Sequence, residues 1–147
     1  MGTLRRELDR KSLAERLGQL RPEAQAQWGT FDAPRMLRHV ADALDAGLGR
    51  LAVAPRGPAA FRYFPLKHLA VYVVPMPKSA KAPPELLAAE PGDFAANRQR
   101  ILAAMEEAAL RRSRSEAQHF LLGRLSPAQW NRLHWKHIDH HLRQFGC

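Results

Sequence analysis

Cysteine is nearly missing from this sequence, since the single one is Cys147 in a chain of 147 residues. A lone thiol excludes an intrachain disulfide and indicates a reducing compartment. Long apolar runs are missing too, because the longest one, Leu69 to Met76, has eight residues and a membrane span needs about 20. The N-terminus leads into charged residues rather than an apolar segment, so we expect no signal peptide. The sequence therefore predicts a soluble, cytoplasmic protein with no membrane partner.

Several motifs of common enzymes are also missing, namely a glycine-rich phosphate loop, a Ser-His-Asp arrangement and a cysteine pattern for zinc. Acidic residues are outnumbered, with 14 Asp and Glu against 23 Lys and Arg and a net charge of +9. This excess is spread evenly, because residues 1–74 carry 12 basic and 7 acidic side chains and residues 75–147 carry 11 and 7. Nucleic-acid binding usually needs a concentrated basic face, so it is the weakest of our functional hypotheses.

What the sequence does contain is four long segments with helical spacing of apolar residues, which predict an all-α fold in a single domain, residues 1–147. Ser126-Pro127-Ala128-Gln129 is a capping box, and it marks the clearest helix start. Asp32 and Asp93 are the expected N-caps of two other helices, and Gly146 is the expected stop of the last. The expected helices cover Thr3–Leu20, Pro34–Leu51, Asp93–Arg112 and Ser126–Phe145.

Residues 52–92 interrupt this pattern between the second and third helices, because they hold eight of the eleven prolines. Proline removes a backbone donor and fixes φ, so no long helix can cross the segment. Its aromatic and aliphatic side chains are too apolar for a solvated linker, so we expect a packed crossover with a short helix around Leu66–Val74. Such a long structured loop is either functional or a purely topological connection.

The histidines are the best candidates for functional residues, because four of the seven lie within the last expected helix. His137 and His141 are four residues apart, which stacks two imidazoles on one face within reach of one metal ion. His39 borders the apolar face of the second expected helix and is the best candidate for a third ligand. His134 lies in the same apolar stripe, and His140 lies off its edge. From spacing alone, a metal site and a set of hydrogen-bonded core histidines are equally good explanations.

The same residues carry a family resemblance. The run from Trp135 to Gly146, with His137, His140, His141 and Gln144, resembles the last-helix signature of the DinB-like superfamily of damage-inducible four-helix bundles. The segment Trp28–His39 is similar to the family's entry into the second helix, which ends in its first metal-binding histidine. Two shorter segments, 75–78 and 125–130, resemble an uncharacterised branch of that superfamily.

This resemblance implies a four-helix bundle with a long proline-rich crossover between helices 2 and 3, frequent dimerisation, and a divalent metal on His39, His137 and His141. Zinc or nickel is the first expectation for the metal, followed by manganese or iron. Characterised relatives transfer a low-molecular-weight thiol, bacillithiol or mycothiol, or use it to isomerise a substrate. We therefore expect a homodimer, with the apolar side chains of residues 61–74 as a contact surface, and a small-molecule substrate.

Two functional hypotheses stay open at this point. In the first, the metal activates water or a thiol cosubstrate, and the protein is a thiol transferase or a hydrolase. In the second, the protein is a non-catalytic metal- or ligand-binding module. His134, His140 and Asp42 are candidates for supporting the ligands or facing the substrate. Each also has an ordinary explanation, as a packed ring for His134, a solvent-facing ring for His140 and a solvated charge for Asp42.

Overall fold

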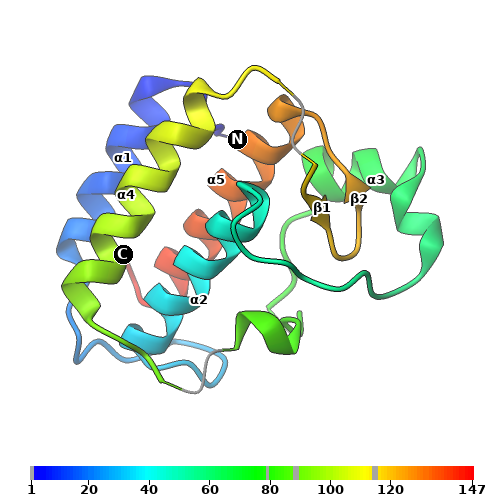
Figure 1. The fold of residues 1–147 in the computed structure, drawn as a ribbon. Coiled ribbons are helices and arrows are strands. Elements are labelled where there is room, and N and C mark those ends of the chain that lie inside the picture. The colour runs from blue at the N-terminus through cyan, green and yellow to red at the C-terminus, as the bar shows by residue number, and fades with distance from the viewer. Residues whose placement is uncertain (1, 79, 88–89, 114–115) are drawn as a thin grey trace.

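The computed structural model describes residues 2–78, 80–87, 90–113 and 116–147. Its framework is all-α and consists of four long helices that lie side by side (Figure 1). Helix α5 packs against each of the other three, and α4 also contacts α1 and α2. The bounds of these helices are α1 Glu7–Gln19, α2 Ala33–Gly47, α4 Phe94–Leu110 and α5 Pro127–Gln144.

The helix ends follow the local signals in the sequence. Asp32 and Asp93 cap α2 and α4 by accepting the backbone N–H groups of Arg35 and Ala96. Ser126 begins α5 with a complete capping box, in which its side chain and that of Gln129 satisfy each other's backbone donors. At the other end, Gly146 takes a φ of +76°, which stops the helix as expected.

Two helices are shorter than expected by about one turn at one end, and the bounds of the other two agree to within two residues. Helix α1 begins at Glu7 rather than Thr3, because the Asp9 carboxylate accepts the backbone N–H of Thr3 and holds residues 3–6 in a turn. Helix α2 ends at Gly47 rather than Leu51. These differences leave the apolar stripes in place.

The main core lies between the four long helices, and most of its side chains come from their apolar faces, with Leu4 and Leu20 added from just outside α1. Leu8 is an exception at the start of α1, since it is 79% exposed and contributes nothing to this core. The residues buried to 1% exposure or less include Leu4, Leu13, Leu17, Met36, Leu37, Val40, Leu44, Ile101, Met105, Ile138 and Leu142.

The crossover between α2 and α4 is structured, and it contains the expected short helix. Helix α3, Leu66–His68, continues into a π-helical turn η2, Leu69–Val73, and two 3-10 turns, η1 (Ala59–Arg62) and η3 (Pro84–Leu86), lie on either side. Val71 of η2 is fully buried in a second apolar cluster with Leu122, Leu125, Trp130 and Leu133. The crossover therefore packs on one end of α5 instead of extending into solvent.

A small antiparallel hairpin is the one departure from an all-α fold among the described residues. Strand β1, Gln118–His119, pairs with β2, Gly123–Arg124. The ring nitrogen Nδ1 of His119 accepts the backbone N–H groups of Leu121 and Leu122, and so closes the turn. Two-residue strands are too short to carry an alternating pattern, which explains why the sequence does not predict them.

None of the helices in the described ranges combines the length and the apolar character that crossing a membrane requires.

Candidate metal centre

Three histidine side chains converge at the contact between α2 and α5. Nε2 of His137 lies 3.0 Å from Nε2 of His39 and 3.1 Å from Nε2 of His141. The nearest ligand atoms of the three residues all lie within 4.8 Å of one another. The histidines that the sequence brings forward as ligands are thus the three that the fold brings together.

The His39 ring is held from behind by the crossover. Its Nδ1 lies 2.9 Å from the backbone oxygen of Leu86 in η3, and His39 and Leu86 are each 5% exposed. A carbonyl oxygen can only accept, so Nδ1 carries the hydrogen and Nε2 carries the lone pair. A hydrogen bond of this kind on the far nitrogen is the usual means by which proteins orient a metal-binding imidazole.

The His141 ring is oriented in the same way by Gln144, one turn further along α5. Nδ1 of His141 lies 2.8 Å from Oε1 of Gln144, and Nε2 of Gln144 donates to the backbone oxygen of Trp28 at 2.6 Å. The second bond determines which way the amide points, so Oε1 faces the imidazole and accepts its Nδ1–H. Nε2 of His141 is therefore left with a lone pair, as in His39.

His137 lies between these two rings, so its Nε2 faces two lone pairs. A single hydrogen on that nitrogen can serve only one of the two acceptors, whereas a cation can take the lone pairs of all three imidazoles. Tetrahedral zinc with bonds of about 2.0–2.1 Å keeps its ligand nitrogens about 3.3 Å apart, close to the two distances from His137, and the third pair lies within 4.8 Å. The donor set and its geometry fit a divalent metal ion.

The surroundings keep these imidazoles in the neutral form that binds metals. Burial lowers the pKa of His141 to about 3, with the charge of His39 acting in the same direction. Burial also lowers the pKa of His39, although the Leu86 carbonyl and Asp42 oppose the shift. The pKa of His137 is well below its usual value, because of burial first and then the neighbouring His141 and His39. All three are therefore neutral ligands near pH 7.

His134 lies apart from this cluster. Its ring is 4% exposed, stacks on Trp130 with the ring centres 5.1 Å apart, and packs against Gly47 at the end of α2. Burial lowers its pKa to about 3, and the charge of His119 contributes in the same direction. His134 is a packed ring, which is the ordinary one of the two explanations that the sequence leaves open.

His140 lies beside the cluster, with its ring edge-on to both His141 and Trp28 at centre distances of 5.2 and 5.8 Å. It is half-buried and does not belong to the cluster of three, and its role in the site stays a prediction.

Asp42 is buried, but it does not orient His39 through a hydrogen bond. Its two carboxylate oxygens bind Arg38 at 2.8 Å and Arg100 at 3.0 Å. Of the two explanations that the sequence leaves open for Asp42, a solvated charge is wrong because the residue is 5% exposed, and it does not hold the His39 ring because the Leu86 carbonyl occupies that place.

Sequence reasoning assigned an orienting role to neither of the groups that orient the ligands, although Gln144 is part of the last-helix signature. Gln144 had a usable signal, since it follows His141 by three residues and therefore lies on the same helix face. The Leu86 carbonyl had none, because every residue carries a backbone carbonyl and only the tertiary structure decides which one reaches His39.

Together, the fold and the site define a helical protein in which two packed helices present three convergent, oriented imidazoles. The family described as "Protein of unknown function (DUF1569)" matches residues 3–146, and the chain belongs to this family. Searches of curated proteins and of solved structures return no match to the chain.

Proposed function

We propose that this protein binds one divalent metal ion through Nε2 of His39, His137 and His141, and that the bound metal activates a nucleophile. The observation that supports this best is the convergence of three Nε2 atoms at 3.0 and 3.1 Å while Nδ1 of His39 and Nδ1 of His141 are occupied by acceptors. Zinc and nickel are the first candidates, followed by manganese and iron, because neutral imidazole suits these ions.

Three protein ligands leave at least one coordination position free, which is the pattern of catalytic rather than structural sites. When bound, the metal would lower the pKa of a water molecule or of a thiol cosubstrate and supply a nucleophile at neutral pH. The chain's own contribution is to hold the three imidazoles neutral and oriented. It does so through burial, the Leu86 carbonyl and the Gln144 amide.

The reaction class that we propose is thiol transfer to an electrophile, or metal-assisted hydrolysis, by a DinB-like four-helix bundle. The side-by-side packing of α1, α2, α4 and α5 supports this proposal (Figure 1). The supply of the three histidines from α2 and α5 supports it as well. The resemblance of the last helix to the DinB-like signature supports it further. Fold and resemblance do not name a substrate, which has to come from a screen.

Metal binding is tested first, by elemental analysis of the purified protein and of a His137→Ala variant. We expect about one metal ion per chain in the parent protein and none in the variant. His68→Ala is the matched control, since His68 is an exposed histidine in α3 outside the cluster, and it should keep full occupancy. A protein without metal after incubation with zinc, nickel and manganese overturns the proposal.

Catalysis is tested separately, with a thiol cosubstrate and a generic electrophile in the presence and absence of the metal. A metal-dependent rate that is lost in His137→Ala supports the enzyme. Full metal occupancy without turnover in thiol-transfer and hydrolase screens favours the second candidate, a non-catalytic metal- or ligand-binding module. A small molecule that survives purification on the metal would strengthen that alternative.

We also propose that the protein is a homodimer, with the exposed apolar side chains of the crossover at the interface. Phe64 is 83% exposed and Tyr63 68%, and Val73 and Val74 are each at least half exposed beside them. Light scattering at two protein concentrations tests this, with Phe64→Ser expected to give the monomer. Leu8→Ser is the control, because Leu8 is a similarly exposed apolar residue on α1. A parent protein that is monomeric at both concentrations refutes the dimer.

A further inference from the structure

The proline-rich crossover returns to the metal centre at η3. Leu86 is the last residue of this turn, and its backbone oxygen is the acceptor for Nδ1 of His39. Two backbone hydrogen bonds of 3.0 Å, from Leu86 to Pro83 and from Leu87 to Pro84, shape the turn itself. These local bonds do not determine where the turn lies relative to α2, so the buried Leu86 side chain and contacts beyond the turn have to hold it there.

Glu85 is the side chain that ties η3 to the rest of the crossover. Its Oε1 accepts the backbone N–H of Ala54 at 3.2 Å and Nη2 of Arg56 at 2.8 Å. Arg56 is itself anchored, because its backbone N–H donates to the oxygen of Phe120 in the hairpin turn at 2.8 Å. Glu85 therefore joins the beginning of the crossover to its end, immediately beside the carbonyl that orients His39.

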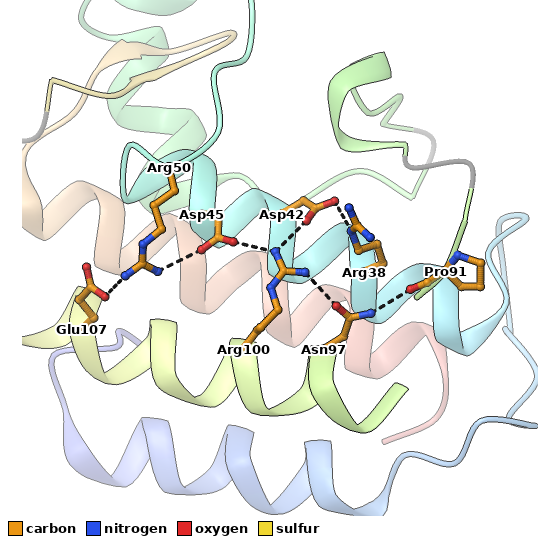
Figure 2. A network of polar contacts seen from close by, with 8 residues as sticks. All are labelled: Arg38, Asp42, Asp45, Arg50, Pro91, Asn97, Arg100 and Glu107. Carbon is orange, nitrogen blue, oxygen red and sulfur yellow. Dashed lines mark hydrogen bonds and ion pairs between the residues drawn. The ribbon is translucent and has the colours of Figure 1, made fainter. Parts of the chain in front are cut away.

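A second set of ion pairs lies nearby and serves as a comparison. In Figure 2, Asp42 and Asp45 of α2 share Arg100 of α4, and Arg50 joins Asp45 to Glu107. These pairs tie α2 to α4 directly. None of the contacts drawn there involves the crossover turn η3, so the Glu107 pair acts on helix packing and the Glu85 pair acts on the position of the Leu86 carbonyl.

We propose that Glu85 is a positioning residue of the metal centre, acting through the Leu86 carbonyl on the orientation of His39. The inference rests on the proposed metal site, and it makes the crossover a part of that site rather than a topological connection. The Glu85 side chain is 28% exposed, and ion pairs at such positions contribute little to global stability. The main effect of its loss is therefore expected at His39.

Groups that orient a metal-binding histidine typically change metal affinity about 10- to 100-fold when they are removed. Glu85→Ala removes the acceptor for both Ala54 and Arg56, so we expect zinc to bind about 10-fold more weakly. Glu85→Gln keeps a neutral acceptor at the same place, so we expect a smaller loss. Glu107→Ala removes a more exposed ion pair to an arginine outside η3, and its zinc affinity should match that of the parent protein.

The experiment measures zinc affinity by chelator competition for the four full-length proteins, together with the ring-nitrogen NMR shifts of the metal-free proteins. In the parent protein, His39 should be protonated at Nδ1. In Glu85→Ala, His39 should become a mixture of the two tautomers, while His141 stays protonated at Nδ1 on Gln144. A purely structural role of Glu85 would not change one histidine and leave the other unaffected.

Unchanged His39 shifts and a zinc affinity within twofold of the parent overturn the inference. It is also overturned if Glu107→Ala weakens zinc binding as much as Glu85→Ala, because the effect is then general. If Glu85→Ala fails to fold, the zinc affinity and the His39 shifts of Glu85→Gln are used in its place. A parent protein that binds none of zinc, nickel and manganese refutes the proposed function, whereas the NMR comparison still shows whether Glu85 orients His39.

Discussion

Gly47 lies at the end of α2 where this helix meets α5, and replacing it with alanine tests the packing between the two. A Cβ atom at Gly47 would lie 2.3 Å from Nε2 and 2.4 Å from Cε1 of His134, and 3.1 Å from Cε3 of Trp130. These two rings are stacked, and they are only 4% and 7% exposed. Neither ring can move away alone, so the substitution forces α2 and α5 apart.

Two opposing effects determine the change in the free energy of unfolding. Alanine is favoured over glycine within a helix by about 1 kcal/mol. Overpacking a buried contact costs about 1–3 kcal/mol, and distances of 2.3–2.4 Å to a confined ring place this case at the upper end. We therefore expect Gly47→Ala to destabilise the protein by about 1–2 kcal/mol, although alanine is the better helix former.

The assay is urea unfolding, with Gly18→Ala as the matched control. Gly18 lies in the last turn of α1, and a Cβ atom there would meet nothing within 4 Å. Here the propensity acts alone, and we expect a gain of about 0.5–1 kcal/mol. In a His134→Ala background, Gly47→Ala should stabilise the protein as well. If Gly47→Ala stabilises the otherwise unchanged protein as much as Gly18→Ala does, the reasoning from the α2–α5 contact is refuted.

Further predictions concern pH, the metal ligands and the helix start. Burial lowers the pKa of His134 to about 3 and that of His119 to about 4. Below about pH 6.5 the unfolded chain binds protons on these two rings while the folded protein does not. The free energy of unfolding is therefore highest above about pH 6.5 and falls toward pH 4, by up to about 1.4 kcal/mol per pH unit for each ring. Urea unfolding from pH 7 to 4.5 should show this, and an equal slope in His119→Asn would contradict it. Gln144→Leu should weaken zinc binding about 10- to 100-fold in chelator competition, and an unchanged affinity would show that the Gln144 amide does not support His141. Ser126→Ala should lower the free energy of unfolding by about 1 kcal/mol, and Ser126→Thr should restore most of it; equal stability of all three proteins would exclude the cap.

The features that can be predicted from the sequence are those set by neighbours along the chain. A cap such as Ser126 acts on residues three positions away, and the apolar stripes follow from the helical repeat. The pairing of His137 with His141 is also local, since residues four apart share a helix face. The short helix within the proline-rich crossover could be predicted for the same reason, because an apolar run lies between proline clusters.

The groups that complete the site depend on contacts between residues far apart in the chain. Asp42 lies one turn from His39 and is a reasonable guess for its partner, but Arg100, 58 residues away, binds that carboxylate instead. The Leu86 carbonyl lies 47 residues from His39, and no side-chain pattern distinguishes it from other carbonyls. The sequence by itself determined the helices and the spacing of the histidines, because these depend on local backbone geometry. The tertiary structure alone decided that the Leu86 carbonyl orients His39, because that depends on how the crossover folds back onto α2.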